Sequence, residues 1–444
     1  MSEIGTAPAP ATAPPPFLAA GDLTYRGGPA PVFVAASGSR LTDAEGRVYI
    51  DAEAANGAAG LGYDAQLLHE AATRAGELPG LPSFCESRLR IELAQQLEQT
   101  ISAAAGAPGR VAFELGGAQG IELAMKVVAA NRPWGQLVTF QGAYHGRSPF
   151  TAHLSASPRY RALLPLGVGE IARLPHPDCE QCPHRQDGEA CSRSCRAAAG
   201  RIGEDRSGVR AEQAAAFLLE PLLNVGGMTL PDGALLRQAA ARLQGAGALL
   251  VVDEIFTGLW RTGRRFGFEL HGLRPDVVVV SKALTNGVGA LSAVWAREPL
   301  LDPQRFPPGT HSSTFAGTPL MLAVAQAVLA RYADDAAWSA RVAQLERSLD
   351  ALVHDLAQAF PAAIRSCYAR GGVARLLLRR PRAAALRAAA LAPASGPLDG
   401  VHGVLVASTG MAPDVIALHP PLTIAPADLE IVRLRLHEAL ERCA

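Results

Sequence analysis

The 444-residue sequence lacks any uninterrupted apolar run of the ~18 residues that a membrane-crossing helix requires. Its start, MSEIGTAPAPATAPPP, has neither the basic beginning nor the continuous apolar stretch of a secretory signal. Net charge is absent too, because 41 Lys and Arg residues balance 41 Asp and Glu residues. Without an excess charge, nothing draws the chain to nucleic acid or to an anionic membrane. We therefore expect a cytoplasmic protein whose partners are small molecules, with no nucleic acid and no membrane among them.

Cysteine is also scarce. The seven cysteines are an odd number in a chain without an export signal, so a disulfide framework is not expected. Four of them fall in the segment PHPDCEQCPHRQDGEACSRSC, as Cys179, Cys182, Cys191 and Cys195. Two such close pairs can surround a structural zinc with four thiolates. An iron–sulfur cluster is the alternative with softer ligands, and a surface insertion with free thiols is the third interpretation.

An apolar fraction of 49% predicts a large core, enough for two or three compact units. Strand and helix patterns alternate from Val111 to Trp295, which predicts an α/β fold with a mainly parallel, doubly wound sheet. A smaller α+β domain should be built from both ends of the chain. The predicted limits are a disordered Ala/Pro-rich tail at 1–16, the small domain at 17–75 and 326–444, and the large domain at 76–325 with a Cys-rich insertion at 175–200. We interpret 381–400 as a variable loop.

Two short apolar runs end in residues that carry chemistry. Asp253 follows the run 248–252, and Lys282 follows the four valines 277–280 with one residue between. Ligands collect at the carboxyl ends of strands in open α/β sheets. A desolvated lysine is neutral and can form a Schiff base with an aldehyde, and a buried carboxylate suits the ring nitrogen of pyridoxal phosphate. Taken singly, each residue is equally well an ordinary strand-end charge.

Two other places fit a cofactor. The strand 217–219 ends in Glu220, and a glycine-rich turn, GGAQG, leads into a helix. Backbone N–H groups at a helix start bind phosphate without a side chain, which makes Gly117 and Ala118 candidates. A tight turn with no ligand is the simpler alternative.

The segments DEIFTGLWRTGRRFGFE and SKALTNG resemble the signature of class III (ω-type) aminotransferases, which are pyridoxal-phosphate enzymes of fold type I. Further blocks similar to this family follow in the expected order between Gly38 and His437: LTDAEGRVYID, GIELAMK, AYHGR, EPLLNVGG, HSSTFAGTP and VIALHPPLTI. Several spaced blocks in order are far more specific than one motif.

The resemblance implies an aminotransferase that moves an amino group between an amino donor and a carbonyl acceptor. It implies an obligate homodimer, because one loop of the active site would come from the second subunit. The resemblance implies that Lys282 forms the Schiff base and carries the proton, that Asp253 pairs with the ring nitrogen, and that Glu220 is a positioning carboxylate. It implies that Tyr144, beside His145, stacks on the cofactor ring and that Ile255 packs on the opposite face. Phosphate binding is implied for Gly117, Ala118 and, from the second subunit, Thr314.

The sequence departs from the family pattern at several positions. Ala118 replaces a serine or threonine, and Phe256 replaces a glutamine. Ala417 stands where relatives carry a carboxylate-binding arginine, and Val225 where they carry the glutamate that neutralises it. We therefore expect a substrate without an α-carboxylate, apolar or carrier-linked, from a specialised biosynthetic pathway.

A co-substrate that does carry a carboxylate would need another cation, for which Arg261 and Arg370 are candidates. Two alternatives to the aminotransferase stay open. A pyridoxal-phosphate aminomutase or racemase of the same fold uses the same lysine and aspartate, and a non-catalytic scaffold keeps only the fold.

Overall fold

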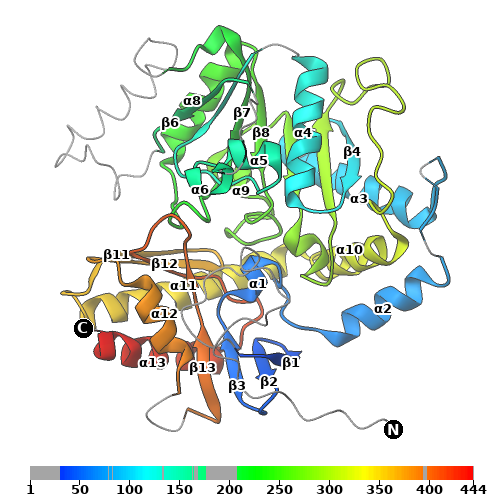
Figure 1. The fold of residues 1–444 in the computed structure, drawn as a ribbon. Coiled ribbons are helices and arrows are strands. Elements are labelled where there is room, and N and C mark those ends of the chain that lie inside the picture. The colour runs from blue at the N-terminus through cyan, green and yellow to red at the C-terminus, as the bar shows by residue number, and fades with distance from the viewer. Residues whose placement is uncertain are drawn as a thin grey trace.

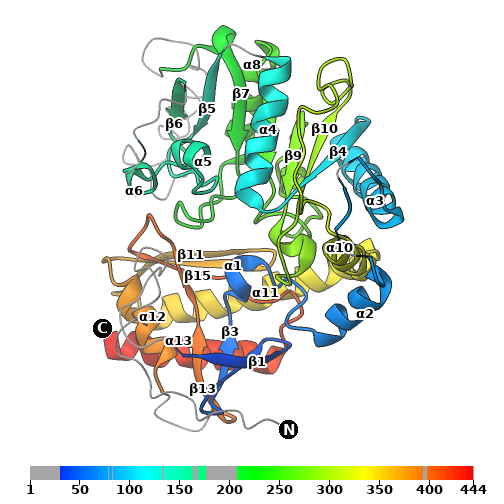
Figure 2. The same ribbon diagram turned by 45° about the vertical axis from the view of Figure 1, so that its right-hand side comes forward.

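The computed structural model describes residues 31–443, apart from 79, 83, 133–134, 163, 165–168, 177–207 and 394–397. In Figures 1 and 2 a seven-stranded sheet with its helices fills the upper half, and two four-stranded sheets fill the lower half. Short segments cross between the halves, among them the single turn α1 (Ala54–Gly57) at their boundary. The domain limits drawn from the sequence stay a prediction.

The seven-stranded sheet has the order β4-β10-β9-β8-β7-β5-β6. Five of its strands run parallel, and β10 is antiparallel to both of its neighbours. The predicted α/β fold with a mainly parallel sheet is therefore confirmed. The bounds are β4 (Gly109–Glu114), β5 (Gln136–Phe140), β6 (Ile171–Leu174), β7 (Ala214–Leu219), β8 (Leu249–Asp253), β9 (Val277–Val280) and β10 (Ser292–Arg297).

The central strands form because their residues are apolar on both faces. Every residue of β7, β8 and β9 is buried, as expected for parallel strands covered by helices on both sides. Helix α4 (Gly117–Asn131) packs on β9 and β10, and α8 (Gly233–Gly245) packs on β7 and β8. Because β7, β8 and β9 are parallel neighbours, their carboxyl ends lie at one edge of the sheet.

Of the two smaller sheets, one combines strands from both ends of the chain and the other contains only strands from 364–418. One has the order β1-β2-β3-β13, in which β13 pairs in parallel with β3, and the other has the order β11-β12-β15-β14. The strands β2 and β3 pair antiparallel and form a hairpin. The bounds are β1 (Phe33–Ser37), β2 (Arg40–Asp43), β3 (Val48–Asp51), β11 (Ile364–Arg370), β12 (Val373–Leu378), β13 (Val401–Leu405), β14 (Ala407–Ser408) and β15 (Val415–Leu418).

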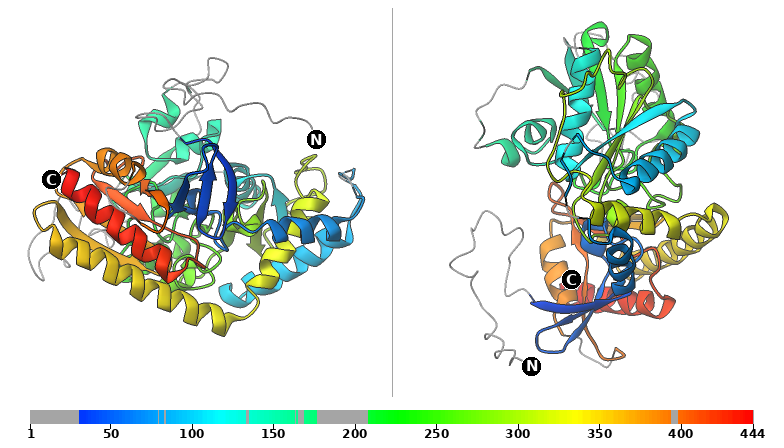
Figure 3. Two further views of the ribbon diagram at one scale, coloured as in Figure 1. Left: turned by 90° about the horizontal axis from the view of Figure 1, so that it is seen from below. Right: turned by 90° about the vertical axis from the view of Figure 1, so that its right-hand side faces the viewer.

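Long helices link and cover these sheets, and Figure 3 shows α11 and α13 side by side, seen from below. The interpretation of 381–400 as a loop was wrong in part, because α12 (Ala383–Leu391) is a helix. Its alanines have the highest helix propensity, and Ala383, Leu386 and Ala390 are buried. The other helices are α2 (Ala65–Ala75), α3 (Arg88–Ala105), α5 (Pro149–Leu154), α6 (Pro158–Arg161), α9 (Gly267–His271), α10 (Pro319–Arg331), α11 (Asp335–Ala359) and α13 (Pro426–Cys443).

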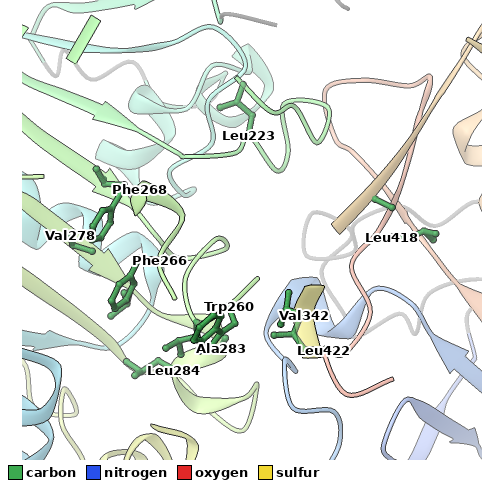
Figure 4. Close-up of a cluster of buried hydrophobic side chains, with 14 of the residues drawn as sticks. Leu223, Trp260, Phe266, Phe268, Val278, Ala283, Leu284, Val342, Leu418 and Leu422 are labelled. Atoms are coloured by element: carbon green, nitrogen blue, oxygen red, sulfur yellow. The ribbon is translucent and has the colours of Figure 1, made fainter. Parts of the chain in front are cut away.

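One continuous apolar cluster runs from the large sheet into the lower half. Figure 4 shows Trp260, Ala283 and Leu284 on one side of it and Val342 and Leu422 on the other. No helix within the described residues is both long enough and apolar enough to span a membrane.

Candidate active site

Lys282 begins the short 3-10 helix η3 (Lys282–Thr285) just beyond β9 and has a φ of +46°. Residues other than glycine rarely adopt this left-handed conformation, and such strain concentrates at functional sites. Desolvation lowers the pKa of Lys282, while the negative fields of Asp253, Glu220 and Glu53 raise it. Lys282 is half-buried, and its amine lies within electrostatic reach of these three carboxyl groups.

Asp253, the last residue of β8, is held by two contacts. Its Oδ2 lies 2.8 Å from Nδ1 of His145, and its Oδ1 accepts a hydrogen bond from the backbone N–H of Ile255 at 3.0 Å. Nε2 of the same imidazole lies 3.2 Å from the Thr139 hydroxyl on β5. All three side chains are buried, so the carboxylate has a fixed orientation. The sequence placed His145 beside the ring-stacking residue but did not predict its contact with Asp253.

Glu220 follows β7 and reaches the loop that carries Tyr144. Its Oε1 accepts the backbone N–H of Tyr144 at 2.8 Å, and its Oε2 accepts that of Asn224 at 3.3 Å. Burial raises the pKa of Glu220, and Asp253 raises it further, while His145 lowers it. The three predicted acid and base residues Glu220, Asp253 and Lys282 thus interact electrostatically, as their positions at strand ends suggested.

The Tyr144 ring packs against Tyr160 in an edge-to-face arrangement with 5.5 Å between ring centroids. The Arg147 guanidinium lies 4.9 Å from the centroid of Tyr160 and 5.9 Å from that of Tyr144. Arg147 belongs to the AYHGR block, yet the sequence analysis did not select it. Its distance from Tyr144 makes it a candidate for contact with a bound anion.

The start of α4 forms a cradle. Its N-cap residue, Gly116, has no side chain that could accept a hydrogen bond, so the first N–H groups of the helix have no capping side chain as a partner. A Cβ on Gly117 would come within 3.0 Å of Cδ1 of Ile255. Ile255 therefore packs directly on the glycine turn, and only glycine allows this close approach. Unpaired N–H groups at the positive end of a 15-residue helix fit a phosphate.

An apolar wall adjoins the lysine. Nζ of Lys282 lies 5.2 Å from the ring centroid of Phe256, and His419 meets the same ring edge-on at 5.4 Å. Burial lowers the pKa of His419 to about 3, so this imidazole is neutral. Ala417 is fully buried in the same wall. The buried members are Leu222, Met228, Phe256, Val373, Leu377, Ala412, Val415 and Ala417.

Thr314 lies apart from these residues. With Cys85, Arg90 and His311 it lines a separate hollow of about 200 Å³, and none of the described residues lining that hollow is Lys282, Asp253 or Glu220. The four clustered cysteines fall outside the described residues. Among the residues that the structure describes, no group of three or more His, Cys, Asp and Glu side chains is placed to hold a metal ion, so the zinc gains no support.

The fit to a cofactor rests on the chain's own atoms: a desolvated amine, a fixed carboxylate and an uncapped helix start, brought together at one sheet edge. Solved structures share the fold. An amine transaminase from an uncultivated Pseudomonas species, solved in its PLP-bound form, has a TM-score of 0.85 at 21% identity and covers 98% of this chain and 100% of its own. The ornithine aminotransferase of Toxoplasma gondii has a TM-score of 0.77 at 21% identity, over 95% of this chain and 92% of its own. The fold is that of fold type I pyridoxal-phosphate enzymes.

The family model for class III aminotransferases matches residues 26–440. The acetylornithine aminotransferase of Mycolicibacterium smegmatis is 30% identical over 414 residues, which is 93% of this chain and 94% of that protein. The protein of the same name from Streptomyces clavuligerus is 31% identical over 413 residues, 91% of this chain and 90% of its own. The chain belongs to the class III aminotransferases, and it is a pyridoxal-phosphate-dependent enzyme.

Proposed function

We propose that this aminotransferase acts on an amine, aldehyde or ketone without an α-carboxylate, in a specialised biosynthetic pathway. The observation that carries the proposal is Ala417, buried in an apolar wall that also contains Phe256, the ring beside Lys282. The loop 222–228 packs on this wall through Leu222 and Met228, and it contains Val225. The arginine and the glutamate that the family carries at positions 417 and 225 are both replaced by apolar residues. The apolar part of a substrate, free or carrier-linked, suits this wall.

The other residues would act on a bound cofactor, which supplies an electron-withdrawing ring when present. The amine of Lys282 would attach to the cofactor and then carry the proton to and from the substrate carbon. The Asp253 carboxylate, oriented by His145, would hold a proton at the ring nitrogen. Glu220 would fix the Tyr144 loop through the backbone, so that the tyrosine ring covers one side of the cofactor.

The remaining contacts would bind the cofactor in place. Ile255 would pack on the ring face opposite Tyr144, and the N–H groups of Gly117 and Ala118 would hold the phosphate. Ala118 provides no hydroxyl for this purpose, so one contact of the family pattern is missing, and the hydroxyl of another residue can add to the binding of the phosphate. We assign that role to Thr314 of a second subunit.

An exposed apolar surface supports the homodimer. Among the residues that the structure describes, six of the nine large hydrophobic side chains that are most exposed lie on α2, α3, the loop between them and the segment 315–320. Exposed apolar side chains favour a contact with another protein, and residues of the same segments, such as Cys85, Arg90 and Ala316, line the hollow that contains Thr314. The six are Leu68, Leu78, Phe84, Ile91, Phe315 and Leu320.

A co-substrate with a carboxylate still needs a cation. Arg370 pairs with Glu346, and Arg261 is buried with its Nη1 donating to the carbonyls of Gly372 and Pro420. Arg370 is therefore engaged by Glu346, whereas Nη2 of Arg261 has no hydrogen-bond partner among the described residues, so Arg261 stays a candidate. Arg147, whose guanidinium lies 5.9 Å from the ring centroid of Tyr144, is a further candidate for this carboxylate.

The curated relatives favour a competing function, since their name states that they act on acetylornithine, an amino-acid derivative. Half-reactions with the pyridoxal form of the enzyme separate the two. Simple ω-amines are compared with ornithine, 4-aminobutyrate and β-alanine, and the loss of cofactor absorbance is followed. We expect faster conversion by at least one carboxylate-free amine, and faster conversion by the amino acids would refute the proposal.

The alternatives to an aminotransferase reaction are tested in the same assay. Release of a carbonyl product together with the pyridoxamine form excludes an aminomutase or racemase as the main activity. Lys282→Ala should lose the visible absorbance of the lysine-bound cofactor and all turnover while the dimer persists. Activity close to wild type in this variant would contradict the role of Lys282.

A further inference from the structure

Glu53 lies on an unusual turn at the boundary between the two halves of the molecule. It follows β3 and is the N-cap of α1, in which Ala54, Ala55 and Asn56 have φ values of 50°, 51° and 59°. Asp51 holds this left-handed turn, because its Oδ1 accepts the N–H groups of Glu53 at 2.8 Å and Ala54 at 2.9 Å. Consecutive residues other than glycine in this conformation are strained and persist only where their surroundings fix them.

The turn faces the candidate active site. Its last residue, Gly57, packs on Phe256 so closely that a Cβ there would lie 2.6 Å from Cε2 of the ring. The same ring lies 5.2 Å from Nζ of Lys282. Glu53 and Lys282 each act on the other's pKa, which places the carboxyl group within electrostatic reach of the amine.

The Glu53 carboxyl group is only partly satisfied. Its Oε2 accepts the N–H of Asn56 at 3.0 Å, and among the described residues its Oε1 accepts no hydrogen bond and no cation lies within 4.0 Å. Burial raises the pKa of Glu53 to about 7 and Asp51 adds to this, while Lys282 and Arg387 oppose it. Glu53 is half-buried, and a carboxylate that is partly removed from water gains from a cation that enters the same space.

We infer that Glu53 binds a second, protonated amino group of the substrate, so that the carboxylate-free amine is a diamine. One amino group reacts at Lys282, and the other, as an ammonium, donates to Oε1 of Glu53. This inference rests on the proposed function and names its substrate class. The same carboxylate repels substrates whose far end is an acid, which agrees with the absence of a cation at Ala417.

Three amines of equal length test the inference: pentane-1,5-diamine, pentan-1-amine and 5-aminopentanoate, which have a cationic, a neutral and an anionic far end. Half-reaction kcat/KM values are measured for wild type, Glu53→Gln and Glu45→Gln. Glutamine keeps an oxygen for the N–H of Asn56 and removes the charge. Glu45 is an exposed carboxylate in the β2–β3 turn and provides the matched control. Melting curves confirm that each variant is folded.

In wild type we expect the diamine to react faster than the monoamine, and the monoamine faster than the amino acid. Glu53→Gln should lower the ratio of diamine to monoamine by about tenfold or more, the size of one charge-assisted hydrogen bond, and should change the monoamine much less than the diamine. The amino acid should gain, and Glu45→Gln should change nothing.

Equal ratios in wild type and Glu53→Gln would overturn the inference. So would a wild-type enzyme that converts the monoamine faster than the amino acid but does not prefer the diamine, and that result would leave the proposed function standing. If 5-aminopentanoate were the fastest substrate of wild type, both the proposed function and this inference would fall.

Discussion

Asp253 and Glu254 are adjacent acids at the end of β8, and their replacement by the matching amides should have opposite effects. Asp253 faces His145, whereas Glu254 is buried on the other side and holds the loop beyond β8. Oε2 of Glu254 accepts the Thr257 hydroxyl and the Gly267 N–H, and its Oε1 accepts the Phe268 N–H at 2.7 Å. We therefore expect Asp253 to act in catalysis and Glu254 to stabilise the fold.

Asp253→Asn keeps the geometry and removes the charge. Its Oδ1 can still accept from Ile255, and its amide can donate to Nδ1 of His145, which then donates from Nε2 to the Thr139 hydroxyl. We expect a change in stability of less than about 1 kcal/mol, since no buried group loses its partner. The charge at the cofactor ring is lost, and the turnover number should fall about 10²- to 10³-fold, by analogy with the loss of one preorganised electrostatic contact.

Glu254→Gln should do the reverse. An amide nitrogen cannot accept a hydrogen bond, so at least one buried N–H of Gly267 or Phe268 loses its partner, at a cost of about 1–3 kcal/mol. Burial raises the pKa of Glu254 from 4.5 to about 7. A raised pKa stabilises the folded state below pH 4.5 and this contribution is lost as the pH rises through 7. Glutamine does not titrate, so the deficit of the variant should be larger at pH 5.5 than at pH 8.

The assay pairs thermal melting with single-turnover half-reactions per mole of bound cofactor. Asp253→Asn should melt near wild type and react slowly, and Glu254→Gln should melt a few degrees lower and react at the wild-type rate. A Glu254→Gln variant as slow as Asp253→Asn, or an Asp253→Asn variant with an unchanged turnover number, would refute this division.

Three other predictions concern single features. Burial lowers the pKa of Lys282 below 10.5, so the unfolded chain binds this proton more tightly than the folded protein does. Without cofactor, Lys282→Met should therefore be more stable than wild type at pH 7, and the difference in the free energy of unfolding should vanish near pH 10.5. Stability curves of the two proteins that run parallel with pH would contradict this. Ala417→Arg places a cation in the apolar wall opposite Arg375, its cross-strand partner on β12, and should cost several kcal/mol in the free energy of unfolding, with partial recovery when Val225→Glu is added. If the four clustered cysteines bind zinc, protein purified without chelator should contain about one metal per chain, and metal-free protein of normal stability would argue for free thiols.

The strand ends were predictable because they depend on local pattern. Four valines in a row predict a buried strand, and the structure shows β9 fully buried with Lys282 just beyond its end in a left-handed conformation. The helix at 383–391 was not predicted, because the prolines and arginines that flank it are typical of a loop, although its alanines favour a helix. Its burial depends on distant neighbours such as α13, which no local pattern contains.

Contacts between segments far apart in sequence could not be predicted either. The hydrogen bond from His145 to Asp253 joins residues 108 positions apart, and it depends on β5 and β8 flanking β7 in the same sheet. Nothing in the sequence pointed to Glu53. Its position depends on a left-handed turn that three consecutive residues other than glycine adopt, and only contacts with distant parts of the chain can hold such a turn. Thr314 was selected by resemblance alone, and within one chain it stays in a separate hollow.

The pairing of the two chain ends has a consequence for biosynthesis. The Ser39 hydroxyl donates to Asp428 on α13, 389 residues further along the chain. At about 5–20 residues per second, a ribosome needs roughly 20 to 80 seconds to make the intervening residues. The seven-stranded sheet can assemble during that interval, while the strands at 33–51 wait for β13 and α13. Their apolar faces stay uncovered longest in the newly made chain, and this early segment is where a chaperone has the most time to bind.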